Sequence, residues 1–572
     1  MLRRTQLLRT PKLARFGSIA PPRPTPQSVS VVAKPVQITS PIFYVNAVPH
    51  IGHLYSAVLG DTLKRWYELK GHTTVYSTGT DEHGLKIQEA AKKAKKDPKR
   101  FCDAISDKFK VLFDDANVSY TRFIRTTDPD HYVAVEAIWR KLVQTGYIYK
   151  GKHEGWYSIS DETFYPPTQV ESVIHAQTGK ESMVSKETGK VVEWTVEENY
   201  KFKLGAVRDR LVEWLEANPE AILPKAQYLN ILNSLKAKPD TDGHDGLGDI
   251  SVSRPVSRLQ WGIPVPDDPS HVIYVWLDAL TNYLTVAGYP WPNAEAQGQS
   301  CWPASWHVVG KDIIKFHAIY WPAFLLAADL PLPHRIISHA HWLQNKTKMS
   351  KSLGNVADPV ALIAKFGHED PVRYFFMRDG GIEYDADFSE EMVMKRYREL
   401  ANQLGNLALR CSGKKVNPDQ IIPTDSGILF PREEEVQLRI MLSDINAKVT
   451  LLFENAQFAR GLEMVMATVA EANRYWDHQK PWILADRISE GGDGADEASK
   501  ELQTALYFCF ETLRIAGILL QPVMPGKMGH LLEWLGVVQG DVKLENARLG
   551  EGAVRQVPVR LSKLEPLFPK LK

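Results

Sequence analysis

The stretch that decides the fold is SPIFYVNAVPHIGHLYSAVLGDTLKRW, residues Ser40 to Trp66. It opens as an apolar run rich in β-branched and aromatic residues, which predicts a β-strand over residues 36–45. Apolar residues at helical spacing follow, up to a glycine suited to end a helix at position 71. Two histidines, His50 and His53, lie where the strand turns into the helix.

A second strand is predicted at TTVYSTGT (73–80), so the chain opens as a β-α-β unit, the start of a doubly wound parallel sheet. The fold class is α/β: a Rossmann-like catalytic domain with an inserted connective module, followed by an all-α helical-bundle domain. The predicted division is 1–34 as a transit peptide, 35–150 and 251–340 as the two catalytic halves, 151–250 as the insertion, 341–395 as a fold bearing a lysine-rich loop, and 396–572 as the helical domain.

The composition is that of a globular protein, with 44% hydrophobic and 24% charged residues in 572, which is enough for three or four domains. No uncharged apolar run approaches the ~20 residues of a membrane helix, so no membrane contact is expected. Four cysteines far apart in sequence argue against a disulfide framework and favour a reducing compartment: Cys102, Cys301, Cys411 and Cys509.

The first 34 residues hold seven cations and no acid, which is typical of a mitochondrial transit peptide and predicts a location in the mitochondrial matrix. A basic tail that touches nucleic acid is the alternative. Removing the seven cations changes the net charge from +1 to −6, so a mature protein that binds nucleic acid needs local basic patches.

The histidine pair has the chemistry of a phosphate site. A helix N-terminus presents backbone N–H groups to an anion, and His50 and His53 add donors to the same place. Gly52 has no side chain, so a flat base could lie on the backbone there. No phosphate-binding loop of the G-x-x-x-x-G-K-[ST] type occurs in the chain. Two partly exposed histidines at a helix start remain the alternative.

A second element near residue 350 strengthens this interpretation. The segment NKTKMSKSLGN (345–355) carries Lys346, Lys348 and Lys351 among small residues and could close over a triphosphate. A solvated basic loop is the alternative for three lysines alone, and its pairing with HIGH about 300 residues earlier argues against that alternative.

With HIGH at 50–53 and KMSKS at 348–352, the chain resembles the class I aminoacyl-tRNA synthetases, and most closely the methionyl-tRNA synthetases, in particular the mitochondrial form. The resemblance extends over nearly everything after residue 36, in ordered motifs that include PIFYVNAVPHIGH, TGTDEHG, GWYSISDETFY, WGIPVP, YVWLDAL, VVGKDIIKFHAIYWPAFL and NLALR. It implies that methionine and ATP form methionyl-adenylate, from which tRNA takes the methionyl group.

The resemblance also implies the site residues. Asp81 would hold the methionine ammonium, and Tyr283 and His317 would approach the sulfur. The implied methionine pocket is Ile42, Tyr44, Asp81, Trp276, Ala279, Leu280, Tyr283, Ile313, His317 and Trp321, and Ile42, Ala279 and Ile313 could equally be core residues. ATP, with Mg²⁺, would be bound by His50, Gly52, His53, Gly310, Lys311, Asp312, Lys348, Lys351 and Arg254, with Arg258 as the alternative to Arg254. The implied catalytic residues are His50, His53, Lys348 and Lys351.

Many relatives hold zinc with Cys-x-x-Cys pairs in the inserted module, but here Ser158 and Asp161 stand at the first pair and the segment has no cysteine. His175 and Asp161 do not complete a tetrahedral site, so no metal is predicted. Aromatic packing is expected to stabilise the module instead, through Trp156, Tyr157, Phe164 and Trp194.

A helical C-terminal domain suits an anticodon reader, and the resemblance implies that Asn406, Arg410 and Trp482 read the anticodon CAU of the initiator and elongator methionine tRNAs. Asn406 and Arg410 are one helical turn apart, and Trp482 could stack on an anticodon base, although a core tryptophan is the alternative. We expect a monomer. Three other functions compete: another class I synthetase, a catalytically inactive RNA-binding paralogue, and a small nucleotidyltransferase that shares only the H-x-G-H chemistry.

Overall fold

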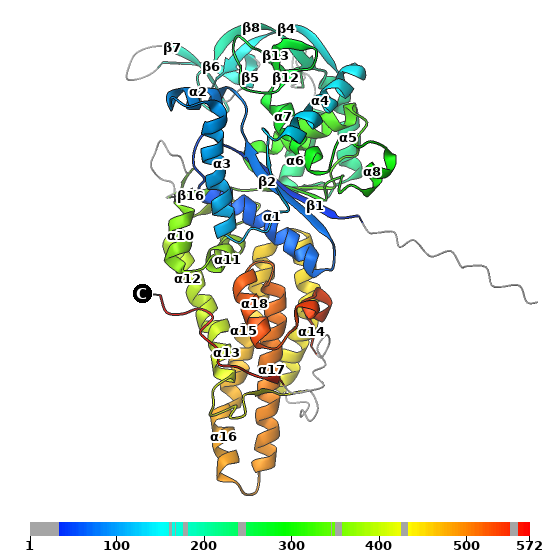
Figure 1. Ribbon diagram of the computed structural model, residues 1–572. Coiled ribbons are helices and arrows are strands. Elements are labelled where there is room, and N and C mark those ends of the chain that lie inside the picture. Colours follow the sequence, from blue (N-terminus) through cyan, green and yellow to red (C-terminus); the bar gives the residue numbers. More distant parts are fainter. Residues whose placement is uncertain are drawn as a thin grey trace, which may run out of the picture. The chain divides into compact units, whose positions relative to one another are not determined.

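A parallel six-stranded sheet forms the centre of the catalytic region in the computed structural model, which describes residues 34–159, 163–165, 167–174, 181–237, 247–344, 346–348, 357–424, 433–549 and 559–571 (Figure 1). The strand order is β3-β2-β1-β14-β15-β9, and every pair is parallel. The bounds are β1 (Val36–Tyr44), β2 (Thr74–Asp81), β3 (Arg122–Arg125), β14 (Trp306–Gly310), β15 (Arg335–His339) and β9 (Ile222–Leu223). The predicted doubly wound sheet is confirmed.

The helices that follow the strands cover this sheet. Helix α1 (Ile51–Leu69) is mostly buried, and the polar residues Ser56, Asp61 and Thr62 are buried along with its apolar ones. The other helices of the catalytic region are α2 (Leu85–Lys93), α3 (Pro98–Asp115), α4 (Pro129–Gln144), α7 (Val275–Val286), α8 (Ala294–Gln299) and α9 (Trp321–Ala327), with a π-helical turn at Phe316–Tyr320. The four cysteines form no disulfide, in agreement with the prediction against a disulfide framework, and all four are buried.

Antiparallel strands form the inserted module. Its four-stranded sheet has the order β10-β8-β4-β5, with β4 (Ile148–Ser158), β5 (Thr163–Tyr165), β8 (Glu193–Phe202) and β10 (Ile250–Ser251). A hairpin of β6 (Val170–Ile174) and β7 (Glu181–Ser185) and a small sheet of β11 (Ser253–Pro255), β12 (Pro264–Val265) and β13 (Asp268–Ile273) adjoin it in sequence. Within the range 151–250, α5 (Arg208–Ala217) and α6 (Lys225–Lys236) flank β9, which is an edge strand of the catalytic sheet.

The expected aromatic packing is present in this module. The rings of Trp156 and Trp194 meet edge to face with centroids 5.5 Å apart, and the rings of Tyr157 and Phe164 are 4.8 Å apart. The cross-strand register explains both contacts, since Trp156 lies opposite Trp194 and Tyr157 lies opposite Phe164.

Helices dominate the rest of the chain. A small sheet of β16 (Trp342–Gln344), β17 (Thr347–Lys348) and β18 (Ala386–Asp387) precedes them. The helices are α10 (Pro359–Phe366), α11 (Asp370–Asp379), α12 (Glu390–Leu400), α13 (Asn406–Cys411), α14 (Glu433–Glu454), α15 (Phe458–Gln479), α16 (Pro481–Glu490), α17 (Ala495–Leu520) and α18 (Pro525–Trp534), and β19 (Ile421–Ile422) pairs with β20 (Val559–Arg560). Figure 1 shows α14, α15 and α17 running alongside one another. Among the described residues, no helix combines the length and apolar character that crossing a membrane requires.

One buried arginine joins the catalytic and helical regions. Arg373 on α11 is 1% exposed, and its Nη2 lies 2.6 Å from Oδ2 of Asp61 on α1. Its other donors reach the carbonyl oxygens of Val523, Pro522 and Ala116, which come from the turn before α18 and the end of α3. Because a buried charge must be paired, these bonds fix the two regions to each other.

Candidate active site

A cavity of about 480 Å³ opens where four strands of the catalytic sheet end. The last residues of β1, β2, β14 and β15, namely Tyr44, Asp81, Gly310 and His339, all line it, together with the start of α1. Ligands bind at this edge of an open parallel sheet.

His50 and His53 cap the first turn of α1 with their rings. The backbone N–H of Gly52 donates to Nδ1 of His50 at 3.0 Å, and the N–H of His50 donates to Nδ1 of His53 at 3.0 Å. Because each Nδ1 accepts a hydrogen bond, a neutral ring carries its proton on Nε2, where it can donate to a ligand. The two rings are 3.8 Å apart, and both line the cavity, as does Gly52. The helix cap and the predicted phosphate site are therefore the same structure.

The opposite end of the cavity is aromatic and apolar. Trp276 stacks on Phe316 with ring centroids 3.6 Å apart. Nine of the ten residues implied for methionine line this one cavity: Ile42, Tyr44, Asp81, Trp276, Ala279, Leu280, Tyr283, Ile313 and His317. The tenth, Trp321, is fully buried, with its ring 6.0 Å from that of Tyr283.

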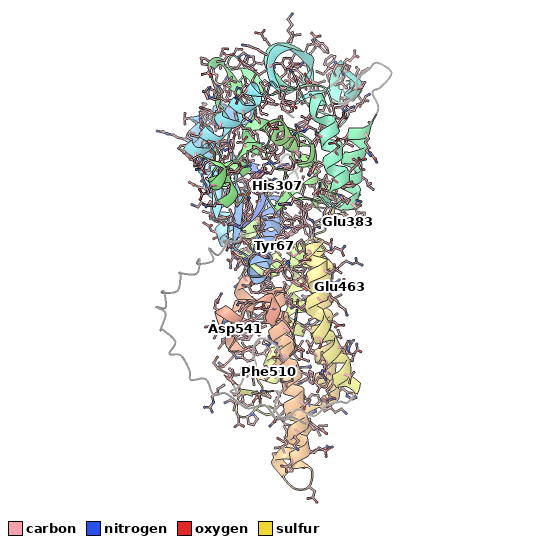
Figure 2. The ribbon with its side chains drawn as sticks, turned by 90° about the vertical axis from the view of Figure 1, so that its right-hand side faces the viewer. Tyr67, His307, Glu383, Glu463, Phe510 and Asp541 are labelled. Atoms are coloured by element: carbon pink, nitrogen blue, oxygen red, sulfur yellow. The ribbon has the colours of Figure 1, made fainter. Side chains whose placement is uncertain are left out.

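Two polar side chains at the aromatic end of the cavity, Tyr283 and His317, are hydrogen-bonded to each other. Nδ1 of His317 lies 2.9 Å from the carbonyl oxygen of Ile313, and its Nε2 lies 2.7 Å from the hydroxyl of Tyr283. The ring thus donates from Nδ1 and accepts from Tyr283. Burial lowers the pKa of His317 to about 4, so the ring is neutral at physiological pH. His307, labelled in Figure 2, packs against the ring of Tyr283 at 4.4 Å. A neutral, mostly apolar pocket of this kind suits a thioether side chain.

The neighbours of Asp81 hold its strand end in place. Glu82 is fully buried and bridges to Arg125 at 2.7 and 2.9 Å. His83, also buried, donates toward Asp278 of α7 at 2.7 Å. The two residues that directly follow the predicted ammonium ligand are thus bonded to β3 and to the helix that carries Trp276.

The nucleotide end contains residues that the sequence analysis missed. His339 Nε2 lies 2.7 Å from the hydroxyl of Ser56 on α1, and His341 Nε2 lies 3.3 Å from Asp312. These side chains line the cavity with Gly310 and with other residues that were not predicted, among them Asn46, Lys86 and Trp342. The sequence did carry one signal, because two histidines in SHAHW (338–342) come at and just after the end of β15, behind its apolar residues Ile336 and Ile337.

Several predicted ATP ligands lie elsewhere. The guanidinium of Arg254 is buried 3.9 Å from the ring centroid of Tyr274 and donates to Ser251 and Ser253. Arg258 pairs with Glu197 at 2.7 Å, so neither arginine lines the cavity. Lys311 pairs with Asp385. Lys351 and the side chain of Lys348 lie outside the described residues.

The three predicted anticodon residues lie on the helical region. Asn406 and Arg410 are exposed on α13, and Arg410 pairs with Asp477 near the end of α15 at 3.2 Å. Trp482, in the first turn of α16, is 40% exposed. The ion pair therefore brings α13 to the end of α15 that leads into Trp482.

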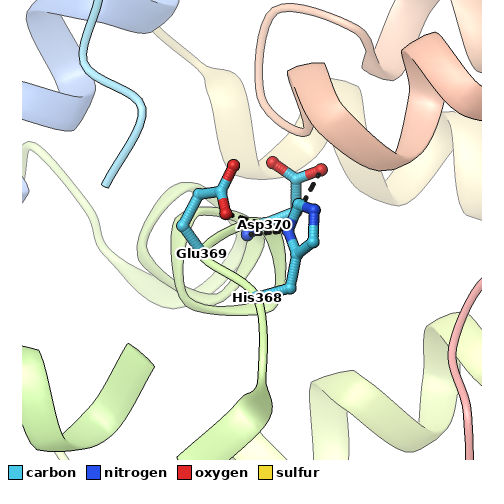
Figure 3. Close-up of side chains that lie close together, drawn as sticks. All are labelled: His368, Glu369 and Asp370. Atoms are coloured by element: carbon cyan, nitrogen blue, oxygen red, sulfur yellow. Dashed lines mark hydrogen bonds and ion pairs between the residues drawn. The ribbon is translucent and has the colours of Figure 1, made fainter. Parts of the chain in front are cut away.

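Among the described residues, one group of side chains brings possible metal-ligand atoms within 4.8 Å of one another: His368, Glu369 and Asp370 (Figure 3). Protein donors already bind it. The backbone N–H of Lys527 donates to Asp370, the amide of Asn117 donates to Glu369, and the N–H of Asp370 donates to His368. The cluster thus joins the start of α11 to the start of α18.

A parallel sheet whose strand ends meet an H-x-G-H helix cap is characteristic of the class I aminoacyl-tRNA synthetases. Residues 36–412 match the family model described as tRNA synthetases class I (M). The chain belongs to the methionyl-tRNA synthetases.

The relatives agree along nearly the whole chain. It is 42% identical over 575 residues to a probable mitochondrial methionine–tRNA ligase of Neurospora crassa, covering 98% of this chain and 89% of that protein. It is 45% identical over 515 residues to the mitochondrial methionine–tRNA ligase of Homo sapiens, covering 87% and 83%. The structure of Mycobacterium tuberculosis methionyl-tRNA synthetase in complex with methionyl-adenylate superposes with a TM-score of 0.84 at 36% identity, covering 94% of this chain and all of that one.

Proposed function

We propose that this enzyme charges initiator and elongator methionine tRNAs for translation in the mitochondrial matrix. As a methionine–tRNA ligase it uses ATP to form methionyl-adenylate and transfers the methionyl group to tRNA. The observation that carries the proposal is the single cavity that joins the His50–His53 cap to the neutral Tyr283–His317 pocket, with Asp81 also lining it.

The chemistry follows from this arrangement. The carboxylate of methionine attacks the α-phosphorus of ATP, the bond to pyrophosphate breaks, and the adenylate remains in the cavity. Donors on Nε2 of His50 and His53 would stabilise the charge that develops on the phosphate oxygens. The Asp81 carboxylate would hold the ammonium, so that the reacting atoms are positioned rather than activated by a covalent nucleophile. The ribose is assigned to Gly310 and Asp312, and Mg²⁺ enters as part of the ATP substrate.

The lysines of KMSKS complete the proposed transition-state contacts. Lys348 and Lys351 are assigned from the sequence, because ammonium groups of a flexible loop can neutralise departing pyrophosphate. Arg254 is not proposed as an ATP ligand. Its guanidinium, held by aromatic rings and by Ser251, is better suited to stabilising the inserted module.

We propose that the inserted module works without zinc. The support is chemical: residues 151–250 contain no cysteine, and Trp156, Tyr157, Phe164 and Trp194 supply packing across the sheet. The module would correspond to 151–250, between catalytic halves at 35–150 and 251–340. Residues 341–395 would support the KMSKS loop, and 396–572 would bind the anticodon.

Anticodon reading is assigned to Asn406, Arg410 and Trp482, supported by their exposure and by the Arg410–Asp477 pair that draws α13 to α15. The expected anticodon is CAU. The basic segment 1–34 and the mitochondrial relatives support import into the matrix. We also propose that the enzyme is a monomer.

The test is exchange of pyrophosphate into ATP by purified enzyme with each of the twenty amino acids, followed by charging of methionine tRNA. Methionine alone should support rapid exchange, and a CAU anticodon should be required for charging but not for exchange. Exchange driven by another amino acid, or no exchange at all, would reject the assignment.

A further inference from the structure

The hairpin that leads into KMSKS is held by one short strand. Strand β16 pairs in parallel with β18, so that Trp342 lies opposite Ala386, and antiparallel with β17, which ends at Lys348. The N–H of Ala386 donates to the carbonyl of His341 at 3.0 Å, and the N–H of Phe388 donates to that of Leu343 at 2.7 Å. Residues 385–388 therefore hold the hairpin whose second strand ends at Lys348, the first residue of KMSKS.

Two aspartates of the same segment bind the ends of the hairpin. Oδ1 of Asp387 accepts from the backbone N–H of Lys346 at 2.9 Å, at a turn where Lys346 has a φ of 58°. Oδ1 of Asp385 accepts from the N–H of His341 at 2.9 Å, just before β16 begins. Since Lys346 adopts a left-handed conformation that disfavours side chains, the bond from Asp387 stabilises the turn.

Asp385 has a further partner on the nucleotide side. Nζ of Lys311 lies 2.7 and 2.8 Å from its two carboxylate oxygens. Lys311 lies between Gly310 and Asp312, both of which line the cavity, whereas Lys311 does not line it. Its ammonium is thus directed to the hairpin support rather than into the cavity.

We propose that Lys311 and Asp385 form a positioning pair, which sets the KMSKS hairpin relative to the nucleotide end of the cavity. The inference rests on the proposed function, and it assigns Lys311 an action through Asp385 instead of a direct contact with ATP. A chain of hydrogen bonds then connects Lys311 with the backbone of His341 and, through the pairing of β16 with β17, with Lys348.

His341 is a further titratable group beside the pair. His341 lies 3.3 Å from Asp312, so the imidazole faces the same loop from the hairpin side. Lys311 and Asp385 have side chains 37% and 28% exposed, and a pair so exposed contributes little to the stability of the fold. The pair can still affect catalysis through the position of the hairpin, because a misplacement of about 1 Å at a reacting centre can lower a rate by about a hundredfold.

The test is a double-mutant cycle with K311M, D385N and K311M/D385N, since the asparagine keeps an acceptor for the N–H of His341. Exchange of pyrophosphate into ATP is measured against both ATP and methionine concentration. Each single variant should lose about 10- to 100-fold in kcat/KM for ATP. The KM for methionine should stay within twofold, and the double variant should be no worse than the poorer single one.

The matched control is E390Q, which removes an exposed ion pair between Lys365 and Glu390 on neighbouring helices of the same small fold. This control should retain the wild-type exchange rate within twofold. The melting temperatures of all the variants should stay near that of the wild type. A large loss in K311M with wild-type behaviour in D385N would mean that Lys311 acts directly on ATP and would overturn the pairing. Losses that multiply in the double variant would do the same. If the wild-type enzyme itself showed no methionine-dependent exchange, the assigned function would fail instead.

Discussion

Replacing Gly52 by alanine should separate catalysis from stability. A Cβ built on Gly52 would lie 2.9 Å from Cε1 and 3.1 Å from Nδ1 of His50. Carbon atoms pack at about 3.5–4.0 Å, so the imidazole must retreat by about 0.6 Å or more. That movement breaks the cap from the Gly52 N–H and shifts the Nε2 donor from its place in the cavity.

The two energies can be estimated. Loss of a helix cap costs about 1 kcal/mol, while alanine in place of glycine in a helix gains about 0.5–1 kcal/mol, so the net change in unfolding free energy is small. A hydrogen bond to a charged phosphate is worth about 1.5–3 kcal/mol. Because about 1.4 kcal/mol is a factor of ten, kcat/KM for ATP should fall about 10- to 150-fold.

Methionine-dependent exchange and thermal melting are the assays, with Gly529→Ala as the control. A Cβ at Gly529, within α18, meets nothing within 4 Å, so this variant should gain about 0.5–1 kcal/mol without change in exchange. If Gly52→Ala kept more than half of the wild-type kcat/KM for ATP, the role given to the His50 cap would be refuted.

Three further outcomes are expected. Trp482→Ala should lower charging of tRNA about 5- to 150-fold by removing a base stack of about 1–3 kcal/mol, with exchange unchanged, and an equal loss in both assays would contradict anticodon contact. Burial raises the pKa of Asp370 from 3.8 to about 7, so its stabilising contribution is complete below pH 3.8 and is lost as pH rises toward 7. In urea titrations, the unfolding free energy of Asp370→Asn should therefore increase relative to that of the wild type as pH rises from 3.8 to 7, by at most about 4 kcal/mol. A difference between the two proteins that does not change with pH would contradict this role of Asp370. Elemental analysis should find no zinc bound, and one equivalent per chain would show that the module holds a metal after all.

The fold was largely predictable from the sequence because its signals are local. The strand that begins at Val36 and the helix after His50 can be predicted from hydrophobic periodicity and composition. Because a strand and a helix in this order begin a parallel sheet with right-handed crossovers, few sheet topologies remain possible. Strand β9 was not predicted, because a strand of two residues is too short to show a hydrophobic period, although it forms an edge of the sheet.

The candidate site was predictable where residues follow strand ends, and it was missed where partners meet only through folding. Ser56 and His339 are separated by 283 positions, and neither has a pattern that names the other. Arg254 shows the opposite difficulty, since spacing gives its place on β11 but not the direction of a long side chain that packs among aromatic rings.

The arginine that joins α11 to its surroundings limits how this enzyme could be divided. The guanidinium nitrogens of Arg373 donate to the carboxylate of Asp61 and to carbonyl oxygens of the catalytic and helical regions. A lysine could not replace it, because an ammonium group has fewer N–H donors and they do not spread in a plane. A catalytic fragment truncated before α17 would leave Arg373 without the carbonyl oxygens of Pro522 and Val523, while its carboxylate partner Asp61 lies on α1, eight residues after His53. A shortened enzyme that only forms the adenylate would therefore require redesign of the contacts of Arg373 first.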